Sequence, residues 1–292
     1  VSDWSSDVCS SDLQLAVLEG ADGAVDVMHD LMQVLGGPAA AYVGGQCEPA
    51  WEELRSWGPA VRKQPLATIA EAVAWETMRR VRVNLELLLP RFQRIGYRLR
   101  SPESALLPPA EAHLFKKLER AAGGPLPLSI AAFWEFMAGV DLTQDHTQTA
   151  HDWLLDDGHA PPDPVALLGD DDPLQVISLG VVCSRLHERP QLDGRLYIFL
   201  APDCFHKAGV SGGENYHLLL PEDGPDFRII GDVSPENDPD WSRYGGGQWF
   251  VSAIRRSMAG GGFRGRLDVE AQDRWSPWRP VHEELAKDLL PI

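Results

Sequence analysis

The chain has 292 residues, of which 44% are hydrophobic and 24% are charged, and its formal net charge is −17. This apolar fraction is ordinary for a globular protein and excludes a chain that is disordered throughout, and the length predicts one or two domains. No stretch approaches the roughly 18 consecutive apolar residues of a membrane helix, and the acidic balance argues against direct binding of nucleic acid.

The first thirteen residues, VSDWSSDVCSSDL, do not have the pattern of a signal peptide, since they lack a basic residue and an apolar core. Residues 7–13 match the translation of a common DNA-sequencing adaptor, so we interpret residues 1–13 as an artefact and expect a different native N-terminus. The other cysteines, Cys47, Cys183 and Cys204, lie far apart and form no CxxC pair. This pattern predicts neither a disulfide framework nor a structural zinc site, and it favours a reducing, cytoplasmic location.

Residues 14–100 carry equal numbers of acidic and basic side chains and are predicted to form a helical segment. Short helices are expected over residues 26–35 and 49–57. Apolar residues then recur at helical spacing from Ala74 to Phe92 and predict a longer amphipathic helix.

Four features refine the prediction for this long helix. Thr68 and Glu71 have the spacing of a capping box at its start. Arg79 and Arg80 fall off the apolar stripe and are expected to face water. Pro90 is expected to kink or end the helix. If the helix continues past Pro90, Gly96 is expected to end it.

Residues 111–267 are predicted to form an α+β domain, in which a largely antiparallel sheet of four or more strands is flanked by helices. The connections between the strands are short and rich in Gly and Pro, which leaves no room for crossover helices. Residues 268–292 are predicted to be a C-terminal extension with a short helix. The expected strands are residues 174–179, 195–200, 216–220 and 227–233, and the expected helices are residues 111–121, 130–137, 249–258 and 281–289.

The acidic excess lies entirely in residues 101–292, apart from the adaptor-like string, and no Lys or Arg occurs between Arg120 and Arg185. Such asymmetry indicates either a solvated loop that keeps the protein soluble or a surface for a basic partner. The predicted partner-binding residues are the acidic and aromatic side chains Asp141, Asp145, Asp152, Trp153, Asp156, Asp157, Asp170, Asp171, Asp172, Trp241 and Tyr244.

Catalytic motifs are weak. Residues 209–213 match G-x-S-x-G, but the expected strand rather than a helix follows the serine. Residues 260–265 match G-x-G-x-x-G but follow an expected helix, so a phosphate-binding loop is not predicted. His146 and His151 stand among aspartates, which leaves a metal site assembled from loops open as an alternative.

Two strings in the second half carry a resemblance to a known family. The strings are LPLSIAAFWEFMAGV at residues 126–140 and APDCFHKAGVSGG at residues 201–213, followed by GGFRG at residues 261–265. Together they resemble the SUKH superfamily, which contains the Smi/Knr-type cell-wall regulators and many bacterial immunity proteins. Arg264 stands where the family pattern has proline. The motif positions are Leu126, Pro127, Phe133, Trp134, Gly139, Pro202, Asp203, His206, Lys207, Ser211, Gly212, Gly213, Gly261, Gly262, Phe263 and Gly265.

The resemblance implies a binding protein without catalytic residues, metal or cofactor. Its implied role is that of an immunity protein, which binds and neutralises a bacterial toxin, and the acidic composition favours a basic toxin such as a nuclease. Two alternatives remain open. One is a regulatory scaffold protein without a toxin partner, and the other is a metal-dependent enzyme that uses His146, His151 and the neighbouring aspartates.

Overall fold

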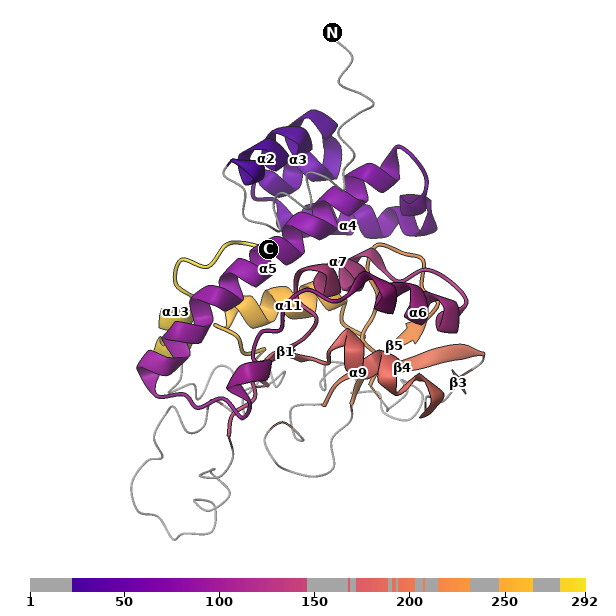
Figure 1. Ribbon diagram of the computed structural model, residues 1–292. Helices are drawn as coiled ribbons and strands as arrows, with labels where there is room; N and C mark the ends of the chain where they lie inside the picture. The colour runs from indigo at the N-terminus through magenta and orange to yellow at the C-terminus, as the bar shows by residue number, and fades with distance from the viewer. Residues whose placement is uncertain are drawn as a thin grey trace.

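The computed structural model shows a mainly helical molecule built around one long helix, α5 (Leu66–Ile95), which runs diagonally through the view in Figure 1. Helices α2 (Ala24–Leu35), α3 (Gly37–Val43) and α4 (Cys47–Trp57), with the 3₁₀ turn η1 (Gly58–Arg62), lie against the first half of α5. The structure describes residues 23–145, 168, 172–188, 191–192, 194–202, 207, 215–231, 247–264 and 279–292.

The apolar stripe of α5 is fully buried from Met78 to Phe92, as its helical spacing predicts. The predicted capping box is wrong, because the helix begins at Leu66 and the Thr68 hydroxyl donates to Gln64 instead. The helix also continues through Pro90, which is exposed on the outer side of the helix, where water can solvate the carbonyl that loses its partner. Gly96, in the left-handed conformation at φ 81°, ends α5.

The second half of the chain packs against α5 through short helices, and it also forms two small sheets (Figure 1). None of the described helices combines the length and apolar character needed to cross a membrane. The elements are η2 (Pro102–Ser104), α6 (Ala112–Ala122), α7 (Leu128–Phe136), β1 (Val140–Asp141), β2 (Gln175–Val176), α9 (Leu179–Ser184), η5 (Leu186–Glu188), β3 (Gln191–Leu192), β4 (Arg195–Ala201), β5 (Tyr216–Leu220), α11 (Phe250–Ala259) and α13 (Arg279–Ala286).

The predicted sheet of four or more strands is wrong. In the described residues, β1 pairs with β2, and β3, β4 and β5 form a separate three-stranded sheet, with every pairing antiparallel. Residues 174–179 make only a two-residue strand, because Ser178 caps α9 by accepting a hydrogen bond from the amide of Val181. In the expected strand at 227–233, the amide of Ile229 donates to Gln248 and the carbonyl of Phe227 accepts from Phe250, at the start of α11. Arg228 and Ile230 form only isolated antiparallel bridges, to Trp249 and to His217 of β5, so this stretch pairs like a strand at single residues without extending the sheet.

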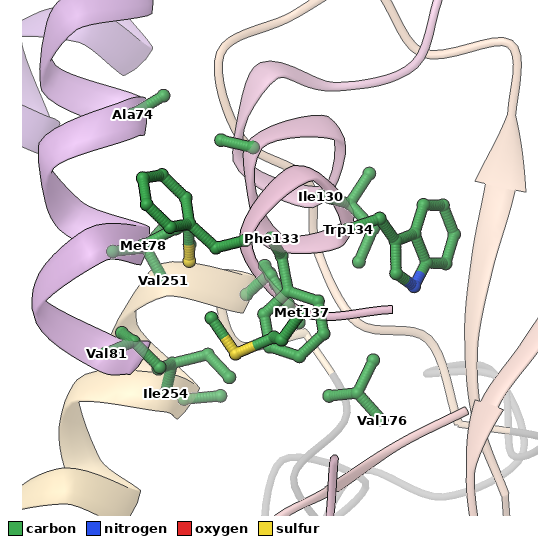
Figure 2. Close-up of a cluster of buried hydrophobic side chains, with 14 of the residues drawn as sticks. Ala74, Met78, Val81, Ile130, Phe133, Trp134, Met137, Val176, Val251 and Ile254 are labelled. Carbon is green, nitrogen blue, oxygen red and sulfur yellow. The ribbon is translucent and has the colours of Figure 1, made fainter. Parts of the chain in front are cut away.

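The buried hydrophobic side chains of the two halves form one continuous cluster. Figure 2 shows its centre, where Met78 and Val81 of α5 face Phe133 of α7 and Ile254 of α11. The ring of Phe133 also meets that of Phe250 edge to face, with centroids 5.8 Å apart. The N-terminal helices are thus part of the same hydrophobic core as the sheets, which fixes their position relative to the rest.

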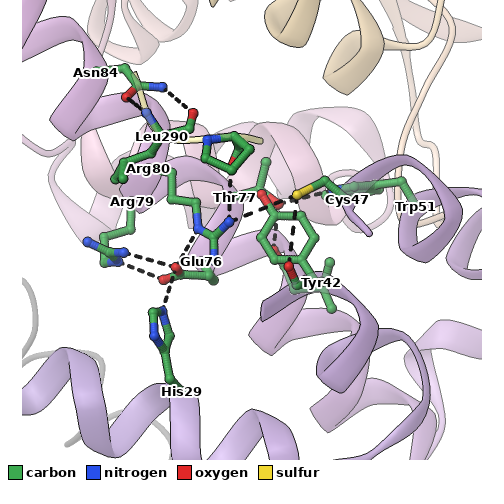
Figure 3. A network of polar contacts seen from close by, with 12 residues as sticks. His29, Tyr42, Cys47, Trp51, Glu76, Thr77, Arg79, Arg80, Asn84 and Leu290 are labelled. Atoms are coloured by element: carbon green, nitrogen blue, oxygen red, sulfur yellow. Dashed lines mark hydrogen bonds and ion pairs between the residues drawn. The ribbon is translucent and has the colours of Figure 1, made fainter. Parts of the chain in front are cut away.

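A buried ionic network joins α2, α5 and the C-terminal tail (Figure 3). The Glu76 carboxylate is fully buried and lies 2.6 Å from Nε of Arg79, 2.7 Å from Nε of Arg80 and 2.8 Å from Nε2 of His29. Arg80 also donates to the carbonyl of Pro291. The expectation that Arg79 and Arg80 face water is therefore wrong, because a carboxylate on the same helix, three and four residues earlier, draws both inward.

Candidate functional site

Most of the predicted partner-binding residues cannot be placed in this structure. Three of them, Asp141, Asp145 and Asp172, are described. The remainder, together with the metal-ligand candidates and part of the family motif, lie outside the described residues: Asp152, Trp153, Asp156, Asp157, Asp170, Asp171, Trp241, Tyr244, His146, His151, Asp203, His206, Ser211, Gly212, Gly213 and Gly265.

Asp141 and Asp145 lie half-buried on the segment that follows α7. Oδ1 of Asp141 accepts hydrogen bonds from the amide of Thr143 at 3.0 Å and from its hydroxyl at 2.5 Å. The amide of Asp145 donates to the carbonyl of Arg98 at 2.9 Å. These contacts hold the turn against the chain that leaves α5, while both carboxylates keep some exposure to solvent.

Asp172 is not a surface residue, and its prediction as a partner-binding side chain is wrong. Its side chain is 3% exposed, and Oδ1 lies 2.7 Å from Nζ of Lys207 while Oδ2 contacts the guanidinium of Arg264. The hydroxyl of Tyr216 lies 3.4 Å from Oδ2. We call these four residues the Asp172 cluster. The two cations compensate the charge of the Asp172 carboxylate, which reduces the cost of burying it.

The electrostatics of the Asp172 cluster favour a structural role. Burial raises the pKa of Asp172, but the charges of Arg264 and Lys207 outweigh it and hold the pKa below its usual value. The cavity beside the cluster, also lined by Gln175, has a volume of about 40 Å³, enough for a few water molecules but much smaller than a typical ligand site. An ammonium paired with a carboxylate is also a poor nucleophile.

The residues of the Asp172 cluster lie next to several of the ranges outside the described residues. The amide of Arg264 donates to the carbonyl of Asp172 at 3.0 Å, in addition to the side-chain contacts. Residues 169–171, 203–206, 208–214 and 265–278 therefore all begin or end next to one cluster. Acidic and basic residues are equal in number within the described ranges, so the net charge of −17 lies on the ranges outside them.

The described motif residues of the SUKH resemblance are mostly core residues. Leu126, Phe133, Trp134 and Phe263 are buried, and the indole of Trp134 donates to the carbonyl of Ile177 at 3.4 Å. Pro127 immediately precedes α7, and Pro202 follows β4. Gly139 lies against the backbone of Ser178, where a side chain would be crowded. These positions are explained by packing and not by ligand contact.

Gly261 needs both its positive φ of 67° and its missing side chain, because a Cβ there would lie 2.5 Å from Cβ of Leu285. We expect Gly261→Ala to lower the free energy of unfolding by about 2–4 kcal/mol through strain and overpacking. Gly45→Ala is the matched control, because Gly45 has φ 88° with open space around it, so it should cost only about 1 kcal/mol. Urea denaturation measures both, and equal losses would contradict the close packing.

A groove that the sequence did not reveal lies between η1, the end of β5 and the start of α11. We call it the Trp249 groove, and its volume is about 350 Å³. On its inner side the buried carboxylate of Asp226 accepts from Arg55 at 3.0 Å, from the Ser129 hydroxyl at 2.9 Å and from the Phe227 amide at 3.0 Å. The residues that define the groove are Arg55, Arg195, Leu219, Glu222, Arg228 and Trp249.

Trp249 lies between two guanidinium groups in this groove. The guanidinium carbon of Arg228 is 4.4 Å from the centroid of the indole, and that of Arg55 is 5.1 Å from it. Arg228 is exposed, whereas Arg55 is almost buried. The sequence does not reveal this contact, because Arg55 and Trp249 are separated by most of the chain and no motif links them.

Within the described ranges, no group of three or more His, Cys, Asp or Glu side chains is arranged to hold a metal ion. Comparison of the chain with protein-family models, with curated proteins and with solved structures finds no match.

Proposed function

We propose that the chain is a non-catalytic protein-binding module of the immunity type implied by the SUKH resemblance, and that it binds and neutralises a basic bacterial toxin. The observation that carries this proposal is the outer face of α2. Val27, Leu31 and Val34 lie on one stripe of this helix and are 53%, 37% and 85% exposed. Exposed apolar side chains that are grouped on one face, and not scattered singly, are typical of a protein-binding surface.

The charges of the N-terminal helices favour a basic partner. Asp26 and Asp30 are exposed on the same helix, and Glu52 and Glu53 are exposed on α4. No Lys or Arg occurs between residues 23 and 54. Acidic groups around an apolar stripe speed association with a basic protein, while burial of the stripe supplies affinity.

The buried carboxylates have structural partners, as expected of a binding protein whose core carries no reaction. Glu76, Asp172 and Asp226 are the carboxylates that the described core buries, and each contacts at least one arginine. Asp172 and Asp226 join distant segments through these arginines, and Glu76 does so through His29. These carboxylates therefore contribute to the fold.

The test is binding to the product of a neighbouring toxin gene, measured by isothermal titration calorimetry. We expect a complex whose affinity falls about tenfold or more between low and moderately high salt, because screening weakens the acidic attraction. Leu31→Ser with Val34→Ser should weaken it further, whereas Val181→Ser, at an exposed position on α9, should not. The absence of a complex with any neighbouring gene product, or a stoichiometric metal ion in the purified protein, would contradict the proposal.

A further inference from the structure

We propose that the Trp249 groove binds the carboxylate of an Asp or Glu side chain presented by a protein segment. This inference does not depend on the toxin partner proposed above, since it concerns other residues and the opposite charge. The groove lies between η1 and the Gly224–Ile230 stretch, and its lining includes no residue of α2. Its volume of about 350 Å³ is at the lower end of the range for ligand pockets and accommodates one or two side chains.

Among the described residues, the groove has one positive charge that no acidic side chain offsets. The carboxylate of Asp226 forms an ion pair with Arg55, and Oε2 of Glu222 lies 3.3 Å from the guanidinium of Arg195. Arg228 makes no ion pair among the described residues, and its hydrogen bond there goes to the carbonyl of Gly247. A guanidinium has five N–H donors, so several donors of Arg228 stay available to an incoming carboxylate.

The position of Arg228 is fixed before a ligand arrives. Its side chain stacks on Trp249, and the two residues also form an isolated antiparallel bridge through their backbones. Trp249 in turn precedes α11, whose first amide donates to the carbonyl of Phe227 at 2.9 Å. A donor group held in place in this way loses little conformational entropy on binding. Arg and Trp are also the residue types that most often dominate binding energy at interfaces.

A single carboxylate fits the groove better than a polyanion does. Nucleic-acid backbones need several cations in a row, whereas the described lining of the groove has one arginine without an acidic partner, in a chain of net charge −17. The apolar walls formed by Leu218, Leu219 and Ile230 favour a carboxylate that stands next to apolar residues.

The experiment uses the full chain and a capped pentapeptide with one Glu between two Leu residues. Binding is followed by the NMR shift of the Trp249 indole N–H, which the Trp249→Phe variant assigns. Because the chain is strongly acidic, non-specific attraction does not favour an acidic peptide, and binding therefore reports on the groove. We expect the same peptide with Gln in place of Glu to bind about tenfold more weakly, since a charge-assisted hydrogen bond is lost.

Arg228→Ala should weaken binding of the Glu peptide about tenfold, and its exposed position predicts an unchanged fold. Arg185→Ala, at an exposed arginine after α9, is the matched control and should bind as the wild type does. The inference is overturned if the Glu and Gln peptides bind equally or if Arg228→Ala binds normally. It is also overturned if inorganic phosphate shifts the indole at lower concentration than the peptide, because the groove would then be a general anion site.

Discussion

Replacing Asp172 by asparagine should lower the free energy of unfolding by about 3–5 kcal/mol, the typical loss when one partner of a buried ion pair is removed. The carboxylate of Asp172 is buried, and the side chains of Lys207 and Arg264, which are also buried, both contact it. An amide offers one acceptor oxygen but no charge, so both cations would lose the carboxylate. Urea denaturation of the purified variant measures the loss.

Asp30→Asn is the matched control, because this aspartate is exposed on α2 and has no ion pair among the described residues. Its free energy of unfolding should stay within about 0.5 kcal/mol of the wild type. A loss below about 1 kcal/mol for Asp172→Asn would show that water or other groups compensate the cations. The ion pairs of Asp172 would then contribute little to holding these segments of the chain together.

The sequence could predict the helices with one apolar face but not the residues that are buried in pairs. On α5 the stripe from Met78 to Phe92 is a local pattern, so its burial follows from spacing alone. Asp172 instead stands in a row of three aspartates, and nothing local distinguishes it from Asp170 and Asp171. Its partner Lys207 is 35 residues away, so only the fold identifies which aspartate is buried.

The sheet prediction was wrong for a related reason. Alternating apolar residues are typical of a strand, but they also occur where a loop packs both sides of its backbone against other elements. Phe227 and Ile229 are buried against the start of α11, and the stretch between 227 and 230 pairs with its neighbours only through isolated antiparallel bridges. The groove beside them was missed because it forms from residues of η1, β5 and α11 that carry no shared motif.

Glu76 should give the protein a stability that is lost in acid. Burial raises the pKa of Glu76, but hydrogen bonds and charges from Arg79, His29 and Arg80 overcome this and hold the pKa near 2, against an ordinary value of 4.5. The folded state therefore binds its proton less readily than the unfolded state does. The resulting stabilisation is complete above pH 4.5 and disappears as the pH falls toward 2. It amounts to about 3 kcal/mol at neutral pH.

Glu76→Gln removes this contribution and should lower the free energy of unfolding at pH 7 by about 3 kcal/mol. Between pH 5 and 3 the variant should lose stability less steeply than the wild type, although Asp172, whose pKa is also lowered, keeps part of the slope. Glu86→Gln is the matched control on the same helix, because its ion pair with Arg82 is largely exposed and should change stability by about 0.5 kcal/mol or less. Urea denaturation at each pH measures these slopes. If the slopes of Glu76→Gln and the wild type were the same, the carboxylate would not be the buried anion that joins α2, α5 and the C-terminal tail.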